Sequence, residues 1–242
     1  MGSSRLPGKV MKDIDGWPML AIMIQRAMAA QLVDTVIVAA PDTENNRPIW
    51  EFVDKAPPVK LIKGPEDDVL SRVLKAAEET HTDVIIELTG DCPLIDPAII
   101  DLVTGYFICG GYDFVGNTSP FSWPRGFDVR VFKTSTLRAV HEAVKGDPRE
   151  AYWRENVSPY IYESGKFNCR NMQAPEGQRA DLNLSVDTPE DFRRVKDIVE
   201  TLRPGNPVFS AHDVLDYLSR LPGYEQLAGP MLEDKTASWL IS

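Results

Sequence analysis

The chain has 242 residues, 43% of them apolar, which is enough to bury one substantial core and typical of a single α/β domain spanning 1–242. Its formal net charge of −10 argues against broad contact with nucleic acid, which needs a clustered cationic surface. The first residues lack a signal-peptide pattern, and no apolar run approaches the ~18 residues of a membrane span, so we expect no membrane insertion.

The three cysteines, Cys92, Cys109 and Cys169, are widely spaced and odd in number. No CxxC pair is present, which argues against a structural zinc site and against a disulfide framework. The pattern therefore favours a reducing compartment, and we expect a cytoplasmic protein.

Strand and helix patterns alternate over the first half of the chain. Apolar spacing predicts helices at 18–30, 46–55, 67–79 and 97–107, and strands at 35–40, 59–62 and 83–88. Such alternation indicates βαβ units in an α/β fold, with a mixed, mainly parallel sheet covered by helices on both faces. Ligands of such sheets gather at the carboxyl ends of the strands.

The second half begins with a different pattern. Residues 113–132 hold two strand-like stretches around Pro120, Pro124 and Gly126, which indicates an antiparallel excursion that serves as a lid or a dimer contact. Helices are predicted next at 134–145 and 149–163, strands at 167–173 and 180–186, helices at 189–202 and 211–220, and a tail at 222–242.

The opening segment, GSSRLPGK, is a candidate phosphate-binding loop. Gly2, Ser3 and Ser4 offer backbone N–H groups, and Arg5 and Lys9 offer cationic side chains. It is not a Walker A loop, because five residues separate its glycines and Val follows the Lys. A flexible terminus explains the same residues equally well at this point.

A second candidate segment, TGDCPLIDP, follows the strand predicted at 83–88. Gly90 and Asp91 then lie at a carboxyl strand end, where ligands bind. Asp96 before Pro97 has the pattern of a helix N-cap, whereas Asp91 has no evident capping role. The alternative is that Asp91 is a solvated loop residue.

A third candidate, VDTPED, again joins a strand to a helix. If Pro189 is the first helical residue, Thr188 is the N-cap and Asp187 is free to bind a cation. The competing assignment makes Asp187 the cap with Glu190 as its capping-box partner. Two carboxylates at separate strand ends, facing a phosphate loop, suit magnesium-assisted nucleotidyl transfer, because Mg²⁺ prefers hard oxygen ligands completed by water and phosphates.

Taken together, these motifs resemble those of a known family. The segments GSSRLPGK, EDDVLSR (66–72), TGDCPLIDP (89–97), WPRGFDV (123–129), RENVSPYIY (154–162) and VDTPEDF (186–192) occur in that order. The ordered set resembles the spore coat polysaccharide biosynthesis cytidylyltransferases, which are related to CMP-Kdo and CMP-sialate synthetases. The resemblance covers residues 1 to about 220.

The resemblance implies a nucleotide-diphospho-sugar transferase fold and a reaction. Arg5 and Lys9 would bind the phosphates of CTP, and Asp91 and Asp187 would bind Mg²⁺. A sugar hydroxyl would attack the α-phosphorus and expel pyrophosphate, a reaction that rests on positioning and charge stabilisation and needs no protein nucleophile. The same resemblance implies a homodimer formed through 113–132.

Further residues are assigned to ligands by the same resemblance. Asp67, Asp68 and Arg72 match a stretch near the nucleotide and sugar, although an ordinary amphipathic surface helix also explains them. The residues expected to meet the sugar are Arg125, Asp128, Arg154 and Glu155. For Arg125 and Asp128 the alternative is a turn stabilised by its neighbouring proline and glycine.

The sequence departs from the family pattern at three places, of which the first two put the acceptor in doubt more than the reaction. Arg130 stands where the family usually has an acidic residue, and Asn156 stands where it has histidine. Relatives also carry a buried strand ahead of the GSSRLPGK loop, which is missing here. Its absence would expose the edges of neighbouring strands, and we expect a misassigned start rather than an impaired protein.

Two other functions compete with a CTP-dependent sugar cytidylyltransferase. One is a truncated or degenerate, non-catalytic binding protein of the nucleotide-sugar fold, which the departures suggest. The other is a nucleotidyltransferase that uses a different NTP, because base choice often rests on backbone contacts that the sequence does not display.

Overall fold

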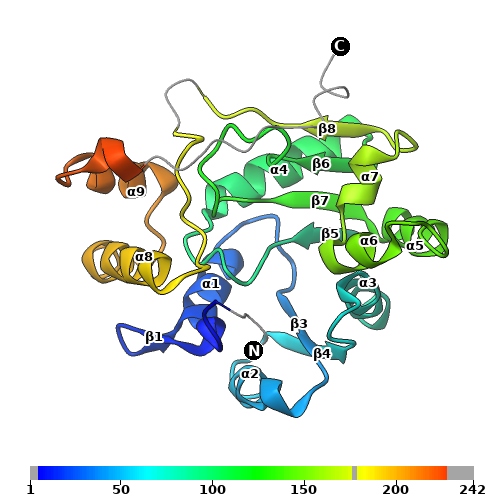
Figure 1. Cartoon of the computed structure of the whole chain (residues 1–242), viewed down its shortest axis with the longest axis horizontal. Coiled ribbons are helices and arrows are strands. Elements are labelled where there is room, and N and C mark those ends of the chain that lie inside the picture. The colour runs from blue at the N-terminus through cyan, green and yellow to red at the C-terminus, as the bar shows by residue number, and fades with distance from the viewer. Residues whose placement is uncertain (1–4, 176–178, 228–242) are drawn as a thin grey trace.

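The strands of the computed structural model, which describes residues 5–175 and 179–227, form three separate sheets (Figure 1). β1 (Asp13–Ile14) and β2 (Trp17–Pro18) make a small antiparallel hairpin that the sequence patterns did not reveal. β3 (Ile37–Pro41) and β4 (Lys60–Gly64) pair in parallel, as a βαβ unit requires.

The remaining strands form a four-stranded sheet in the order β5-β7-β6-β8. Its strands are β5 (Val84–Glu87), β6 (Phe114–Gly116), β7 (Arg130–Lys133) and β8 (Cys169–Asn171). β7 pairs antiparallel with both β5 and β6, whereas β6 and β8 are parallel. The mixed α/β sheet is confirmed, but its parallel share is smaller than expected because the 113–132 excursion inserts two strands into it.

Helices cover both faces of this sheet. They are α1 (Met19–Met28), α2 (Arg47–Val53), α3 (Val69–Glu79), α4 (Pro97–Gly110), α5 (Thr134–Ala143), α6 (Glu150–Asn156), α7 (Pro159–Glu163), α8 (Pro189–Leu202) and α9 (Ala211–Ser219). In Figure 1, α3, α5, α6 and α7 lie together at the right, and α1, α8 and α9 lie at the left. Short 3₁₀ turns lie at Lys9–Met11 (η1), Glu44–Asn46 (η2) and Tyr224–Leu227 (η3).

Alternation along the central strands explains this layering. Val129 and Val131 enter one apolar cluster with α1, α4, α8 and α9, and Phe132 enters another with α3, α5, α6 and α7. Because side chains of a strand point alternately to opposite faces, each strand contributes to both clusters. The site described below lies at the end of this sheet.

One predicted helix, 149–163, is two helices in the structure. Val157, with φ of 65°, ends α6, and Ser158 and Pro159 begin α7. A positive φ is costly for a β-branched residue and breaks the helical path. Pro159 is the first residue of α7, a position that proline favours, so the start of the second helix had a signal in the sequence.

The strand predicted at 180–186 does not form. Asn183 makes only an isolated bridge with Arg125, where Arg125 N–H donates to the Leu182 carbonyl at 3.0 Å and Leu184 N–H donates to the Arg125 carbonyl at 2.7 Å. The segment therefore follows a loop rather than a sheet. Its apolar residues are buried all the same, which is why they resembled a strand.

Within the described residues, β3 and β5 do not pair with each other. β3 pairs only with β4, and β5 pairs only with β7, so the two sheets remain separate. The described chain before η1, residues 5–8, forms a turn and no strand. Each of β3 and β5 is therefore hydrogen-bonded to one strand within the described residues.

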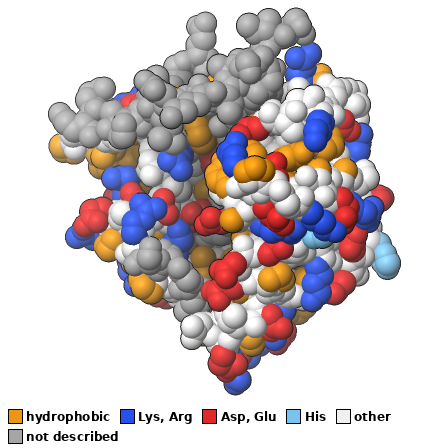
Figure 2. All heavy atoms as spheres, turned by 45° about the vertical axis from the view of Figure 1, so that its right-hand side comes forward, with side chains coloured by type: hydrophobic (Ala, Val, Ile, Leu, Met, Phe, Trp, Pro, Cys, Tyr) orange, Lys and Arg blue, Asp and Glu red, His pale blue; other side chains and the backbone are white. Residues whose placement is uncertain are grey.

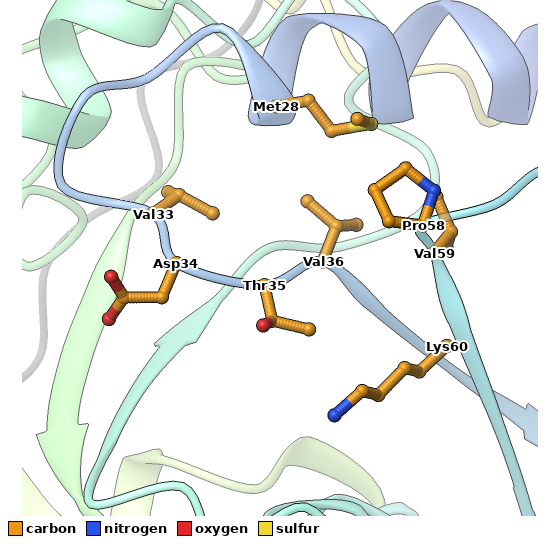
Figure 3. Close-up of a pocket in the computed structure, with 8 residues that line it drawn as sticks. All are labelled: Met28, Val33, Asp34, Thr35, Val36, Pro58, Val59 and Lys60. Atoms are coloured by element: carbon orange, nitrogen blue, oxygen red, sulfur yellow. The ribbon is translucent and has the colours of Figure 1, made fainter.

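A cavity of about 280 Å³ lies at the opposite end of β3 and β4 from their carboxyl termini (Figure 3). Met28, Val33, Val36 and Val59 supply much of its wall, and Asp34 and Lys60 supply its charges. Because ligands of parallel strands bind at the carboxyl ends, this cavity is not where the nucleotide chemistry is expected.

The surface carries charges of both signs. In Figure 2, basic and acidic side chains are interspersed over the face shown, without a continuous basic area. Over residues 5–175 and 179–227, none of the helices combines the length and apolarity that crossing a bilayer demands. All three cysteines are free thiols in the structure.

Candidate nucleotidyl-transfer site

Three segments that are far apart in the sequence meet at Lys9. Its ammonium Nζ lies 3.1 Å from Asp91 Oδ2 and 3.2 Å from Asp187 Oδ1, and it donates to the Val186 carbonyl at 2.6 Å. The three charged side chains are largely buried, with exposed fractions of 14% for Lys9, 28% for Asp91 and 25% for Asp187. A single cation thus bridges the two carboxylates that the sequence analysis singled out.

The backbone holds the two aspartates together. Asp91 follows β5 in a short turn, in which Cys92 N–H donates to the Thr89 carbonyl at 3.1 Å. Val186 N–H, next to Asp187, donates to the Asp91 carbonyl at 2.8 Å. The two loops are therefore fixed to each other by a main-chain bond.

Helix capping leaves Asp187 free for the site. Thr188 is the N-cap of α8 and forms a capping box with Asp191: Asp191 N–H donates to Thr188 Oγ1 at 3.2 Å, and Thr188 N–H donates to Asp191 Oδ2 at 2.9 Å. This confirms the first of the two assignments, with Asp191 rather than Glu190 as the partner residue.

Capping also separates Asp91 from Asp96. Asp96 caps α4, accepting from Ala98 N–H at 2.8 Å, and it accepts from Ala211 N–H at 2.6 Å as well. It is 5% exposed and has a structural role, as predicted. Asp91 caps no helix, so its carboxylate remains available to ligands.

Electrostatics keep Asp91 ionised. Burial acts to raise the pKa of this carboxyl, but the charge and the hydrogen bond of Lys9, together with a hydrogen bond from Thr89, hold it below its ordinary value. An ionised carboxylate is the form that binds a cation. The neighbouring Cys92 thiol is buried, which raises its pKa well above the ordinary value and makes it a poor nucleophile.

The phosphate-loop residues are placed in part. Arg5 lies at the site, with its NH2 group 3.4 Å from Asp187 Oδ2 and a side chain that is 65% exposed. Gly2, Ser3 and Ser4 lie outside the described residues. Gly90 adjoins Asp91, and a Cβ added there would meet only the Val10 side chain at 3.5 Å, an ordinary contact, so the site needs no glycine for space at this position.

Arg125 and Asp128 belong to a tight loop beside this site. Asp128 Oδ1 accepts from Gly126 N–H at 3.1 Å, and burial raises the pKa of its carboxyl. Gly126 has φ of 107°, and a Cβ there would lie 2.8 Å from the Leu184 carbonyl carbon. The backbone of residues 125–128 thus forms the glycine-containing turn that was the alternative to a sugar-binding role. The Nε of Arg125 is buried without a hydrogen-bond partner among the described residues.

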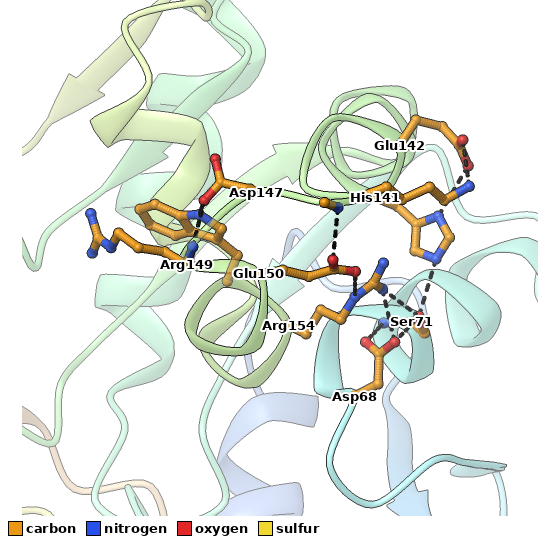
Figure 4. Close-up of polar contacts among 11 residues, drawn as sticks. Asp68, Ser71, His141, Glu142, Asp147, Arg149, Glu150 and Arg154 are labelled. Atoms are coloured by element: carbon orange, nitrogen blue, oxygen red, sulfur yellow. Dashed lines mark hydrogen bonds and ion pairs between the residues drawn. The ribbon is translucent and has the colours of Figure 1, made fainter.

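Asp68 and Arg154 pair with each other (Figure 4). Asp68 is the N-cap of α3, where Oδ1 accepts from Ser71 N–H at 2.9 Å, and its Oδ2 lies 2.9 Å from Arg154 NH1. Arg154 Nε also donates to Glu150 at 2.7 Å. These bonds tie α6 to α3, and any ligand role of either residue would add to this structural one.

Arg72 and Glu155, which the resemblance also assigned to ligands, make no printed contact with Lys9, Asp91 or Asp187 in the described structure. Arg72 is buried, and its guanidinium donates to the backbone carbonyls of Ala39, Pro65 and Glu66. Glu155 is exposed and has no bonded partner in the described part of the chain. Their ligand roles therefore stay predictions.

Two contacts near this end of the sheet were not evident from the sequence patterns. The Val186 carbonyl accepts from Lys9, a main-chain contact that no motif displays. Glu87 ends β5 and pairs across the ladder with Arg130, the residue noted only as a departure from the family. A charged residue at the last position of an otherwise apolar strand was the one available signal for Glu87.

Comparison with known proteins decides the family. The cytidylyltransferase family matches residues 1–234 of this chain. The chain belongs to the cytidylyltransferase family. This cytidylyltransferase is also similar to a solved cytidylyltransferase from Leptospira borgpetersenii, with a TM-score of 0.82 and 29% identity over 93% of this chain and 92% of the other. The predicted nucleotidyltransferase and its nucleotide-sugar transferase fold are thereby confirmed.

Two curated relatives of this cytidylyltransferase carry informative names. The spore coat polysaccharide biosynthesis protein SpsF of Bacillus subtilis is 28% identical over 92% of each chain. A 3-deoxy-manno-octulosonate cytidylyltransferase of Anaeromyxobacter sp. strain K is 35% identical over 43% of this chain and 42% of its own length.

The donor set of this cytidylyltransferase fits a magnesium ion completed by substrate. Within residues 5–175 and 179–227, no group of three or more His, Cys, Asp or Glu side chains forms a ready-made metal cage. Asp91 and Asp187 nevertheless supply two hard oxygen ligands that already share one cation, Lys9. Mg²⁺ is often bound by one or two carboxylates with water and phosphate oxygens, so this pair suits it.

Proposed function

We propose that this cytidylyltransferase transfers CMP from CTP to a sugar, with Mg²⁺ held by Asp91 and Asp187. The observation that carries the proposal is the convergence of both carboxylates on the Lys9 ammonium at 3.1 and 3.2 Å. The site thus brings together a cation for phosphates and two carboxylates for a metal. Bound Mg²⁺ would stabilise negative charge on the phosphates.

In this reaction an acceptor hydroxyl oxygen forms a bond to the α-phosphorus of CTP. The bond from that phosphorus to the pyrophosphate oxygen breaks, the hydroxyl proton is released, and pyrophosphate leaves. Lys9 and Arg5 are the cations of this chain that lie beside the carboxylates, so they would orient the phosphates. Such positioning and charge stabilisation can supply most of the catalysis.

The acceptor is proposed to be an acidic sugar for a cell-surface polysaccharide. Two relatives support this choice, one named for spore coat polysaccharide biosynthesis and one for 3-deoxy-manno-octulosonate. Arg125 supports it as well, because a buried guanidinium nitrogen without a partner suits a carboxylate on the sugar. We further propose a cytoplasmic location, consistent with three free cysteines.

A homodimer formed through 113–132 also remains a proposal. β6 and β7 of this segment are interior strands of the four-stranded sheet, so the connection between them is the part available to a partner. A sedimentation profile showing a dimer at micromolar concentration would support it, and a monomer would remove it.

Pyrophosphate release from each of the four NTPs, with Mg²⁺ and a panel of acidic sugars, tests the proposed reaction. We expect release with CTP alone, lost in D91N and D187N and retained in K12M, a control for the loss of a nearby lysine. Release with another NTP would make the protein a nucleotidyltransferase of different base choice. Neither binding nor turnover of CTP would favour the non-catalytic alternative.

A further inference from the structure

Asp191, in the first turn of α8, accepts more hydrogen bonds than the capping box requires. Its Oδ2 accepts from Thr188 N–H at 2.9 Å, which is the bond of a capping-box partner. The same oxygen accepts from Thr188 Oγ1 at 2.8 Å and from Asp187 N–H at 3.2 Å. Three donors from two consecutive residues therefore converge on one carboxylate oxygen.

These bonds hold the backbone on both sides of the Asp187 Cα atom. In the peptide unit before it, the Val186 carbonyl accepts from Lys9 Nζ at 2.6 Å and the Asp187 N–H donates to Asp191. The peptide unit after it is held through Thr188 N–H, which donates to the same oxygen. Because peptide units are planar, holding both of them restricts the direction in which the Asp187 side chain leaves the backbone.

The second oxygen of Asp191 faces a cation. Its Oδ1 lies 3.5 Å from Arg194 NH1, and that nitrogen also donates to the Asn183 carbonyl at 3.0 Å. The side chain of Asp191 is only 12% exposed. A carboxylate with donors at one oxygen and a guanidinium at the other has its orientation set by the protein.

The capping box of α9 lacks the bond to the preceding residue. There Asp213 Oδ2 accepts from Ser210 N–H at 2.7 Å and from Ser210 Oγ at 2.8 Å, as in α8. The residue before that cap is Phe209, whose N–H donates to the Asn206 carbonyl at 3.2 Å instead. Asp213 is also exposed, whereas Asp191 is buried. The additional bond of the α8 box thus goes to the residue that carries a site carboxylate.

We propose that Asp191 is a positioning residue for Asp187, which holds the Asp187 carboxylate in place for the metal. The inference rests on the proposed function, in which Asp187 binds Mg²⁺. Lys9 would leave the two carboxylates when nucleotide binds, whereas the bonds of Asp191 do not involve Lys9. Residues that orient a metal ligand without touching the metal typically change metal affinity by about 10- to 100-fold.

Electron paramagnetic resonance titration of free Mn²⁺ into the whole chain, without nucleotide, tests the positioning role. We expect D191A to raise the Kd for Mn²⁺ roughly tenfold. The matched control is D213A, which removes the partner residue of the α9 capping box and should leave this Kd unchanged. Both variants should lower the midpoint of urea unfolding, so metal affinity separates positioning from capping. D191N keeps an oxygen that accepts from N–H groups, and it should bind Mn²⁺ more tightly than D191A.

Amide hydrogen exchange of the native chain gives a second test that needs no variant, and it decides the matter if D191A does not fold. With Mg²⁺ present, the Asp187 amide should exchange at least about tenfold more slowly than an unprotected amide. An unprotected Asp187 amide would overturn the inference, and so would equal Kd values for Mn²⁺ in D191A and D213A.

The D187N variant separates this inference from the proposed function. If D187N binds Mn²⁺ as tightly as the wild type, the metal site of the proposed function is wrong. If D187N binds Mn²⁺ weakly while D191A binds it as the wild type does, the metal site stands and the positioning role of Asp191 is overturned.

Discussion

Lys9 Nζ and Asp91 Oδ2 lie 3.1 Å apart although 82 positions separate the two residues in the sequence. Together with the contact to Asp187 Oδ1 at 3.2 Å, this ion pair neutralises two carboxylates that would otherwise repel each other. The ammonium stands between the oxygens that we assign to the metal. Lys9 therefore acts as an internal counterion, and under the proposed function it would release the carboxylates when metal and nucleotide bind.

Removing this counterion is expected to favour the metal. In K9M, Mn²⁺ binding without CTP should tighten roughly fivefold, because a partly exposed ion pair contributes up to about 1 kcal/mol. CTP affinity should fall in the same variant, since the phosphates lose a cation. Electron paramagnetic resonance titration of free Mn²⁺ measures the first effect, with K12M as the control. Weaker Mn²⁺ binding by K9M would contradict the counterion role.

Two nearby aspartates should respond in opposite ways. D91N should lower kcat by about 10²-fold or more, the range for losing one charge-stabilising group, while changing stability little. D96A should lower the free energy of unfolding by about 1–2 kcal/mol through loss of the α4 cap, and leave kcat of the folded fraction unchanged. Urea unfolding measures the stability, and pyrophosphate release measures kcat. A large stability loss in D91N together with a large kcat loss in D96A would refute the roles assigned to the two aspartates.

Asp91 should also shape the response to acid. Its pKa in the folded protein lies below the unfolded-state value of about 3.9, so its ionised form stabilises the fold above that pH. This contribution is lost as the pH falls through the folded-state value. The stability difference between the wild type and D91N should thus be constant from about pH 7 to pH 5 and change only below about pH 4. The midpoints of urea unfolding measure this stability difference. A difference between the wild type and D91N that changes near neutral pH would contradict the lowered pKa of Asp91.

Asp67 and Asp68 offer a matched comparison of a solvated and a capping residue. D68A should lower the free energy of unfolding by about 1 kcal/mol or more, because it removes the α3 cap and the partner of Arg154. D67A should change it by no more than about 0.5 kcal/mol, since no described residue bonds its carboxylate. If D68A instead raises KM for CTP without a loss of stability, Asp68 is a nucleotide ligand first.

Gly126 should resist substitution more than Gly146. Both have positive φ, but a Cβ at Gly126 would lie 2.8 Å from the Leu184 backbone, whereas at Gly146 it would meet nothing within 4 Å. G146A should cost about 1–2 kcal/mol from the left-handed backbone alone. G126A should cost clearly more and should also disturb the loop that carries Arg125 and Asp128. Equal unfolding free energies for the two variants would show that the loop shifts to accommodate a Cβ at position 126, contrary to this prediction.

The sequence predicted the local capping of helices better than the order of the strands. Proline at the first helical position identified Asp96 as a cap, because capping depends on residues adjacent in the chain. It left Thr188 and Asp187 as alternative caps of the later helix, and the structure decides for Thr188. Strand pairing depends on distant partners, so β7 between β5 and β6 was not predictable from periodicity. The expected strand at 180–186 failed for the same reason.

Glu87 and Arg130 show the limit most clearly. Each residue ends or begins a strand with an unremarkable local pattern, and only the register between β5 and β7 places them side by side. The burial of Glu87 Oε2, which accepts no hydrogen bond from the described residues, is likewise a property of the packed structure. The sequence shows a charged residue at each of the two positions, but it does not show that the strand register brings them close together.

Calorimetric titration of CTP into the protein, with and without Mg²⁺, tests the central claim most directly. We predict that the wild type binds CTP in a Mg²⁺-dependent way, that D91N and D187N lose this dependence, and that D54N, at the exposed end of α2, keeps it. Binding of CTP with the same affinity in D91N, D187N and the wild type would show that the two carboxylates gathered around Lys9 are not the metal site.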